Sequence, residues 1–330
     1  MNPVFVSGEV AREVFSWTEA VAALQAVYGR PFGPGACPAR TVATTDGSWL
    51  RTLPANPPGS RYFGAKLMAA SMNATDRAVE YVIVLFERES GRIAGFLDAN
   101  LITAFRTAAT SSAALDKLAP KRPLRLGVIG SGLEASMHTR GFAAVRKLDE
   151  VLVYSTTPAK RDAFATTLSQ ELGIPVRAVE RPQDAVGNAD VVLTAARSHD
   201  EKPILFADWL SEQAMVVSIG STVPQQREID VSVVERADLI VCDMLDEVVH
   251  ETGDMIAARA AGIDVEGRSA TLNALMDGSL ADRLESVRRP MFKSVGGGLQ
   301  DVVVGELILT KAIEAGLAVP LPMQFERKAL

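Results

Sequence analysis

Three cationic side chains stand where the surrounding sequence gives them little structural use. Arg40 follows a loop rich in proline and glycine, Lys66 interrupts an apolar strand pattern, and Arg106 lies among Ala, Ser and Thr. An arginine fork binds a carboxylate through two hydrogen bonds, and a lysine acts as a point charge or a proton donor. Each residue alone is more often part of a surface ion pair or a side chain that extends to solvent. As a set, they have the chemistry to hold and protonate an anionic substrate.

A glycine pattern at residues 126–135, Leu-Gly-Val-Ile-Gly-Ser-Gly-Leu-Glu-Ala, joins a predicted strand to a predicted helix. In that context G-x-G-x-x-A indicates a dinucleotide site, and the alternative is a glycine turn that binds nothing. Gly130 would make the tight turn, Gly132 would let the backbone approach a pyrophosphate, and Ala135 would allow close helix–strand packing. The other residues predicted to line this loop are Ser131, Leu133 and Glu134. Beside such a site, the three cations predict an anionic substrate held next to a nicotinamide.

The end of the second predicted strand bears on which nicotinamide cofactor binds. A ribose 2′-hydroxyl is usually held by an acidic residue about 20 residues after the glycines. Here the strand ends in Tyr-Ser-Thr-Thr (154–157), without a carboxylate. Hydroxyl groups and cations suit a 2′-phosphate, which favours NADP(H), with NAD(H) as the alternative. The residues predicted to bind this phosphate are Ser155, Thr156, Lys160 and Arg161. In the competing interpretation, the two cations simply open an exposed helix.

Other polar residues lie where predicted strands end. Ser221 and Thr222 belong to the segment Ser-Ile-Gly-Ser-Thr-Val-Pro (218–224), which follows a buried apolar run, and Thr194 ends the strand before it. Because ligands bind at the carboxyl ends of parallel strands, we expect all three near the cofactor. Asn73 either positions the substrate or makes a turn. Thr252 or Asp254 is expected to cap a helix.

The elements that must position these residues follow two patterns. Strand-like runs dominate residues 41–98, and the clearest are 63–68 and 80–86. Beyond residue 124, strands alternate with helices, which predicts a Rossmann-type, doubly wound parallel sheet. The predicted strands of this sheet are 125–129, 151–155, 190–194, 215–219 and 238–242, and helices are predicted at 17–29, 103–118 and 300–316.

A proline-rich break at residues 119–123 separates the two patterns, so we predict an α/β protein with two domains. Residues 1–118 and 303–330 would form a mixed α+β substrate-binding domain, and residues 119–302 the dinucleotide-binding domain. Irregular loops at 31–60 and 286–300 are expected to shape the substrate pocket.

Composition argues against several classes of protein. The 330 residues are 48% hydrophobic and 22% charged with a net charge of −6, which is typical of a soluble protein that attracts neither nucleic acid nor anionic membrane. Two cysteines, Cys37 and Cys242, argue against a disulfide framework. The histidines show no metal-ligand spacing; they are His138, His199 and His250. The sequence also lacks a secretory signal and a run of about 18 apolar residues, so we expect a cytoplasmic protein.

Six segments carry a resemblance to the ornithine cyclodeaminase/mu-crystallin family across nearly the whole chain. They are Cys-Pro-Ala-Arg (37–40), Gly-Ala-Lys (64–66), Thr-Ala-Phe-Arg-Thr-Ala-Ala (103–109), Gly-Ser-Gly-Leu-Glu-Ala (130–135), the run 219–230 and the run 293–301. The resemblance implies a homodimer whose first domain makes the subunit contact. It implies that Arg40 and Arg106 bind the substrate carboxylate and that Lys66 polarises or protonates the imine or carbonyl. It also places Asp301 near the nicotinamide, although an acid at a helix N-terminus is the alternative.

Position 222 separates activities within the family that the chain resembles. True cyclodeaminases carry an aspartate there, two residues before the proline, which takes part in deamination and ring closure. Thr222 has no carboxylate. A hydroxyl fits the imine-reductase and amino-acid-dehydrogenase members better, because hydride transfer is the whole reaction there. The alternatives are an ornithine cyclodeaminase with catalytic NAD, and a non-catalytic NADP-dependent binding protein of the mu-crystallin type.

Overall fold

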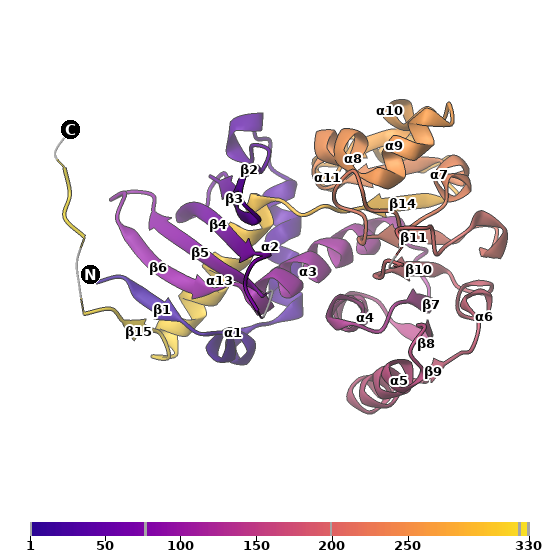
Figure 1. Cartoon of the computed structure of the whole chain (residues 1–330), viewed down its shortest axis with the longest axis horizontal. Coiled ribbons are helices and arrows are strands. Elements are labelled where there is room, and N and C mark those ends of the chain that lie inside the picture. Colours follow the sequence, from indigo (N-terminus) through magenta and orange to yellow (C-terminus); the bar gives the residue numbers. More distant parts are fainter. Residues whose placement is uncertain (1, 76–77, 199, 323–324, 329–330) are drawn as a thin grey trace. The chain divides into compact units, whose positions relative to one another are not determined.

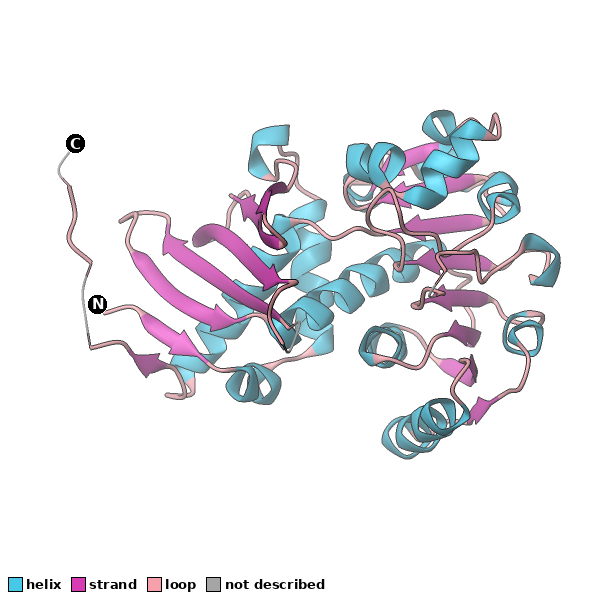
Figure 2. Cartoon of the chain, in the orientation of Figure 1, coloured by secondary structure: helices cyan, strands magenta, loops and turns pink. Residues whose placement is uncertain are grey.

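The computed structural model describes residues 2–75, 78–198, 200–322 and 325–328, and the chain forms two compact units. Unit 1 consists of residues 1–106 and 297–330, and unit 2 of residues 107–296. The division falls inside helix α3 (Asn100–Leu118). Figure 2 shows that both units combine helices with a sheet, as predicted for an α/β protein. Among the described residues, no helix is both long enough and apolar enough to span a membrane.

Unit 1 is built on a seven-stranded mixed sheet with the order β15-β1-β6-β5-β4-β3-β2. Strand β1 runs parallel to β6, and the other neighbouring pairs are antiparallel. The strands are β1 (Val4–Val6), β2 (Thr41–Thr45), β3 (Ser48–Ala55), β4 (Tyr62–Ser71), β5 (Val79–Glu87), β6 (Ile93–Asp98) and β15 (Val319–Pro320). The helices of this unit besides the start of α3 are α1 (Gly8–Val14), α2 (Trp17–Tyr28), the 3₁₀ turn η1 (Pro34–Ala36) and α13 (Gly298–Glu314).

One face of this sheet is covered by α13, which packs against β3, β4 and β5 and in turn against α2 (Figure 1). Side chains alternate between the faces of a strand, so Ile83 and Leu85 of β5 point to the covered face and are fully buried. At Gly298 a side chain would meet the carbonyl oxygens of Leu53 and Pro54 within 2.6 Å. Glycine therefore lets the first turn of α13 approach β3 closely, which brings the start of this helix onto the sheet.

Unit 2 contains eight parallel strands in the order β13-β12-β14-β11-β10-β7-β8-β9. The chain runs outward from β7 to β9 and then returns to β10 on the other side of β7. This reversal makes the gap between β7 and β10 the point where such sheets bind ligands, and it confirms the predicted doubly wound sheet. The strands are β7 (Leu124–Ile129), β8 (Leu148–Tyr154), β9 (Val176–Ala178), β10 (Val191–Thr194), β11 (Met215–Ser218), β12 (Leu239–Cys242), β13 (Ser269–Thr271) and β14 (Pro290–Lys293).

Helices connect most of these strands. They are α4 (Leu133–Val145), α5 (Pro158–Leu172), α6 (Pro182–Val186), the 3₁₀ turn η2 (Ala207–Trp209), α7 (Val231–Arg236), α8 (Leu245–Glu251), α9 (Gly253–Ala260), α10 (Val265–Arg268), α11 (Leu272–Met276) and α12 (Ala281–Leu284). Ile129, Val192, Val216 and Ile240 contribute to one apolar core in this unit.

The expectation of irregular loops at 31–60 and 286–300 was wrong in part. The first range contains β2 and β3, and the second contains β14, which lies in the middle of the parallel sheet between β11 and β12. Strand β14 is only Pro-Met-Phe-Lys, begins with a proline and ends with a charge, so it lacks the apolar run that predicts a buried strand. All four of its residues are buried nonetheless.

Candidate active site

In unit 1 the structure brings Lys66, Arg106 and Asp301 into one buried cluster. Lys66 lies on β4, Arg106 on α3, and Asp301 in the first turn of α13. Asp301 Oδ1 is 2.9 Å from Lys66 Nζ and 2.9 Å from Arg106 Nε. The three side chains are at most 7% exposed. Two cations thus share one carboxylate oxygen away from bulk water.

This cluster carries a net positive charge, because two cations face one carboxylate. Buried charges are costly unless they are paired or hydrogen-bonded, so the excess charge favours an anion beside the cluster. Asp301 Oδ2 is buried and accepts no hydrogen bond from the described residues. The cluster can therefore attract a carboxylate through its cations and accept an N–H bond at Oδ2.

Sequence reasoning missed two residues that hold this cluster. Gln300 Oε1 accepts a hydrogen bond from Arg106 Nη1 at 2.9 Å, and Gln300 Nε2 donates to the hydroxyl of Tyr28 at 3.2 Å. Gln300 and Tyr28 are both buried, so Arg106 is fixed from its far side. Gln300 stands next to Asp301 in the run 293–301, and that adjacency was the available signal. Tyr28 ends α2, and nothing in the local sequence links it to the other residues.

The other two predicted substrate residues of unit 1, Arg40 and Asn73, lie at the two ends of β2. Arg40 directly precedes β2, and its side chain is half-buried. Asn73 donates from Nδ2 to the backbone oxygen of Asp46 at 2.7 Å, in the turn between β2 and β3. Asn73 therefore braces that hairpin turn, which is the second of the two interpretations offered for it.

In unit 2 the predicted cofactor loop has the form that a pyrophosphate requires. Gly130 has φ of +115°, and a side chain there would meet Ala195 O at 2.6 Å. Gly132 precedes the first turn of α4, and a side chain there would meet nothing within 4 Å, so the loop leaves open space at the helix N-terminus. Ala135 is fully buried, Glu134 is half-buried and Leu133 is 50% exposed. This cradle fits the pyrophosphate of a dinucleotide.

The end of β8 lies beside this loop. Ser131 Oγ donates to Ser155 Oγ at 2.8 Å, which ties the loop to β8. Arg161 Nη1 donates to Ser155 O at 3.0 Å, and its guanidinium carbon lies 6.0 Å from the centre of the Tyr154 ring. Thr156 and Lys160 are exposed. Two cations and two hydroxyl groups therefore stand around the end of this strand.

The turn after β11 is held by hydrogen bonds within itself. Thr222 binds Gln226 Oε1 through both its backbone N (2.9 Å) and its Oγ1 (3.1 Å), and Ser221 Oγ donates to Gln226 O at 2.7 Å. Thr194 is fully buried, and its hydroxyl donates to Val217 O at 3.4 Å, inside the sheet. Of these residues, only Thr222 and its neighbours up to Gln226 are partly accessible.

A second buried polar cluster, which the sequence did not reveal, lies beneath this turn. Lys293 Nζ is 2.8 Å from Ser218 Oγ and 3.2 Å from Asp254 Oδ2, and Ser218 Oγ donates to Glu228 at 2.7 Å. Glu228 also accepts from the backbone N of Gly220 at 2.9 Å. The cluster thus ties the end of β14 to both ends of the 218–228 turn.

Thr252 occupies the N-cap position of α9, as expected, whereas Asp254 lies in the first turn of that helix. Helix α9 has no side-chain cap, and Thr252 Oγ1 donates to Val248 O instead. Asp254 is fully buried and accepts from the backbone N of Glu228 at 2.8 Å. Burial raises the pKa of Glu228, and the charge of Asp254 adds to that shift while Lys293 opposes it.

Other chemistry finds little support in the described part of the chain. No group of three or more His, Cys, Asp or Glu side chains lies together there in a way that suits a metal ion. Neither Cys37 nor Cys242 forms a disulfide. His138 is buried between Ser111 and the backbone of α4, His250 is exposed, and His199 lies outside the described residues.

Comparison with known proteins identifies a family and several relatives of this chain. The sequence matches the ornithine cyclodeaminase/mu-crystallin family over residues 20–316. Iminosuccinate reductase from Paracoccus denitrificans is 30% identical over 237 residues, which cover 72% of this chain and 72% of that protein. Ketimine reductase mu-crystallin from Mus musculus is 28% identical over 316 residues, which cover 93% of this chain and 96% of that protein. Thermococcus litoralis Delta(1)-pyrroline-2-carboxylate reductase, solved with NADH and L-proline, has a TM-score of 0.88 and 25% identity, and covers 96% of this chain and 100% of that chain.

Proposed function

The chain belongs to the ornithine cyclodeaminase/mu-crystallin family, and we propose that it reduces the C=N bond of an imino acid with NADPH. It is an NAD(P)-dependent oxidoreductase of the class that acts on CH–NH groups. The observation that carries the proposal is the buried cluster of Lys66, Arg106 and Asp301, whose net positive charge suits an anionic imine. The relatives named above are reductases of such compounds, and two of them carry the imine in their names.

In this proposal Arg106 and Arg40 bind the substrate carboxylate. Gln300 orients Arg106 by accepting from its Nη1, so that the opposite edge of the guanidinium is directed to Asp301 and the substrate. Lys66 Nζ donates the proton that the imine nitrogen gains, and Asp301 holds Nζ in position through Oδ1. Asp301 Oδ2 accepts an N–H bond from the substrate nitrogen. General acid–base groups placed in this way typically accelerate a reaction by about 100- to 10,000-fold.

The cofactor is proposed to bind along the Gly130–Ala135 loop and the end of β8. When bound, NADPH supplies the hydride that the imine carbon receives. The reaction then balances as imine, NADPH and one proton giving amine and NADP⁺. Ser155, Thr156, Lys160 and Arg161 are proposed to hold the 2′-phosphate, because the end of β8 presents cations and hydroxyl groups and no carboxylate. Ser221, Thr222 and Thr194 are proposed to line the cofactor site at the carboxyl ends of β10 and β11.

Thr222 is the observation against the second candidate, ornithine cyclodeamination with catalytic NAD. That reaction needs an acid at this position, whereas the Thr222 hydroxyl is engaged with Gln226 Oε1. The third candidate, a binding protein without turnover, is weakened because the mu-crystallin relative is itself named a ketimine reductase. The full set of Lys66, Arg106 and Asp301 also favours an enzyme.

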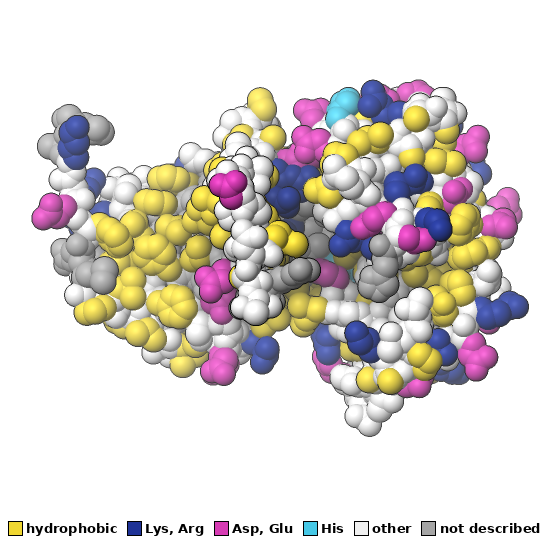
Figure 3. Space-filling view, viewed as in Figure 1, with side chains coloured by type: hydrophobic (Ala, Val, Ile, Leu, Met, Phe, Trp, Pro, Cys, Tyr) yellow, Lys and Arg dark blue, Asp and Glu magenta, His cyan; other side chains and the backbone are white. Residues whose placement is uncertain are grey.

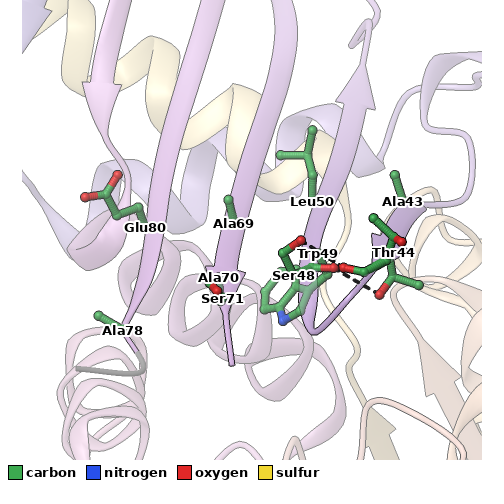
Figure 4. A pocket seen from close by; sticks show the side chains of 11 residues that line it. Ala43, Thr44, Ser48, Trp49, Leu50, Ala69, Ala70, Ser71, Ala78 and Glu80 are labelled. Atoms are coloured by element: carbon green, nitrogen blue, oxygen red, sulfur yellow. Dashed lines mark hydrogen bonds between the residues drawn. The ribbon is translucent and has the colours of Figure 1, made fainter. Parts of the chain in front are cut away.

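We further propose a homodimer formed through the face of the unit 1 sheet that α13 leaves uncovered. Residues on this outer face are largely apolar: Phe5, Leu50, Phe63, Leu67, Val82, Val84, Phe86 and Phe96. Figure 3 shows hydrophobic side chains gathered over β4, β5 and β6. At the β2 end, Leu50 and Ala69 line a groove of about 780 Å³ (Figure 4). A second copy of the chain is expected to cover this outer face. A twofold interface brings the same patch of both subunits together, and an apolar patch can pack against itself.

The test is a screen of NADPH oxidation against cyclic ketimines, and against pyruvate or glyoxylate supplied with amines. The proposal expects oxidation with at least one imine and formation of the corresponding amino acid. Incubation with ornithine provides the contrasting assay. Cyclodeamination would release ammonia and proline with no net change in nicotinamide absorbance. Absence of oxidation with every imine, together with ammonia release from ornithine, would refute the proposal.

A further inference from the structure

One buried carboxylate joins two segments at the ligand-binding edge of the unit 2 sheet. Glu228 Oε1 accepts a hydrogen bond from the backbone N of Ala196 at 3.1 Å, and Glu228 Oε2 accepts one from the backbone N of Gly220 at 2.9 Å. Ala196 follows the end of β10, and Gly220 follows the end of β11. These strands are neighbours in the parallel sheet (Figure 1). A single side chain therefore sets the spacing of the two segments that follow them.

The predicted pyrophosphate loop packs against the first of these segments. A side chain at Gly130 would meet Ala195 O at 2.6 Å and Ala196 Cβ at 3.1 Å, so the loop lies directly on residues 195 and 196. A side chain at Gly220 would overlap the Glu228 carboxylate and meet Ala196 O at 2.9 Å. Both glycines thus permit an approach that a larger residue would prevent. The glycine loop, the segment after β10 and the turn after β11 are therefore packed in sequence, and Glu228 joins the last two.

Glu228 is itself held in position from several sides. Its side chain is fully buried. Its backbone N donates to Asp254 Oδ1 at 2.8 Å, and its backbone oxygen accepts from the backbone N of Ile204 at 2.8 Å. Ser218 Oγ donates to Glu228 Oε2 at 2.7 Å and accepts from Lys293 Nζ at 2.8 Å. Because hydrogen bonds are stronger in a buried environment, this carboxyl group makes a rigid link between the two segments.

The place of this link on the sheet indicates which part of a dinucleotide it serves. A dinucleotide lies across the crevice where the strand order reverses, with its pyrophosphate at the glycine turn. In the proposed function, the adenosine half lies at the end of β8, on one side of β7. The nicotinamide half then extends to the other side, where β10 and β11 end. The two segments that Glu228 joins lie on that side.

We propose that Glu228 is a positioning residue for the nicotinamide half of the cofactor, because it fixes the segments after β10 and β11 that border this half. The inference rests on the proposed function of the cofactor site. Glu228 acts through the backbone of Ala196 and Gly220 and takes no part in the bond changes.

Glu228→Gln tests the link with little change in the size of the side chain. A glutamine amide has one acceptor oxygen and an NH₂ group that only donates, whereas Ala196 and Gly220 both present N–H groups to this side chain. Either orientation of the amide therefore breaks one of the two hydrogen bonds.

The binding test compares two ligands by calorimetry. They are NADPH and 2′,5′-ADP, which carries the adenosine and the 2′-phosphate of NADPH but lacks the nicotinamide half. Glu228→Gln should weaken NADPH about 10-fold, the usual cost of one unpaired buried group, and leave 2′,5′-ADP within about twofold of wild type. At saturating NADPH, kcat should fall by about 10-fold or more with little change in the KM for the imine, because a displaced nicotinamide slows hydride transfer. A general loss of structure would instead weaken both ligands alike.

A second variant and a control accompany this test. Gly220→Ala should reproduce the selective loss of NADPH, because the added methyl group would displace the Glu228 carboxyl group without changing its charge. Asp190→Asn is the matched control. Asp190 Oδ2 accepts from the backbone N of Arg125 at 2.8 Å, so this carboxylate joins β10 to β7 at the opposite, amino ends of the strands. Asp190→Asn should leave the ratio of the two affinities as in wild type.

The outcomes separate this inference from the proposed function. A selective loss of NADPH supports the inference even if no imine is reduced, and in that case only the proposed reaction is wrong. Equal loss of both ligands, or loss of neither, overturns the inference while imine reduction by the wild type stands. Gly220→Ala decides if Glu228→Gln does not fold. If the wild type prefers NADH, then NADH and AMP replace the two ligands and the same comparison decides. A wild type that binds neither dinucleotide overturns both proposals.

Discussion

Replacing Lys66 with methionine tests the proposed proton donor with little change in packing. In the wild-type cluster Asp301 Oδ1 faces two cations, each at 2.9 Å. Lys66→Met leaves one cation and one carboxylate, a balanced pair, so we expect the free energy of unfolding of unit 1 to change little. Turnover should fall by about 100- to 10,000-fold, the usual contribution of a general acid. NADPH affinity should remain, because the proposed cofactor residues lie in unit 2.

Asp301→Asn is the contrasting variant for this prediction. It leaves two buried cations without their carboxylate, and breaking a buried pair in this way costs about 3–5 kcal/mol. The two variants should therefore fail in different ways. Lys66→Met should stay folded and be inactive, whereas Asp301→Asn should unfold at a lower urea concentration than the wild type. Steady-state NADPH oxidation, NADPH titration and urea unfolding measure the three quantities. Turnover of Lys66→Met within about threefold of wild type would refute the assignment of Lys66 as proton donor.

Four further predictions concern the cofactor site, the buried cluster of unit 2 and the outer face of unit 1. Arg161→Ala should weaken NADPH about 10-fold and leave NADH nearly unchanged in titrations; an equal loss for both would contradict the 2′-phosphate assignment. Lys293→Met should lower the free energy of unfolding of unit 2 by about 3–5 kcal/mol, because Asp254 loses its buried partner, and Trp209 fluorescence would follow this unit. Burial raises the pKa of Glu228 in the folded protein. The contribution of this carboxyl group to the free energy of unfolding is therefore full below its unfolded pKa near 4.5 and is lost as pH rises through its folded pKa. Glu228→Gln should remove the contribution of Glu228 to the pH dependence of the free energy of unfolding. An unchanged pH profile would contradict this role of Glu228. Val84→Asp, on the outer face, should halve the mass measured by light scattering if that face joins two copies, and a wild-type mass would exclude this interface.

Local patterns in the sequence were sufficient for most of the fold. The helix predicted at 17–29 ends at Tyr28 with Gly29 as its C-cap, as its glycine indicated, and is capped at its start by Ser16. The glycine loop at 130–135 joins β7 to α4 as its spacing required. These features depend on residues a few positions apart, so their signals are present in a short window.

The clusters of charged residues could not be derived in the same way. Lys66 and Asp301 are separated by 235 residues, and only the approach of α13 to β3 at Gly298 joins them. Lys293 meets Asp254 across 39 residues, after β14 has been inserted between β11 and β12. From the sequence alone, a charged residue in a four-residue strand such as β14 would be assigned to the surface, because its distant partner is not known. The predicted residues Lys66, Arg106 and Asp301 were chosen by type and motif, while their common ion pair emerged only in the fold.

The central claim is that this chain reduces an imine with NADPH, and its stoichiometry tests the claim most directly. Purified enzyme would receive limiting imine and excess NADPH, and both NADPH consumed and amino acid formed would be measured. The account predicts that the two amounts are equal and that Lys66→Met forms neither. Amino acid formed without NADPH consumption, or ammonia and proline released from ornithine at constant NADPH, would contradict it.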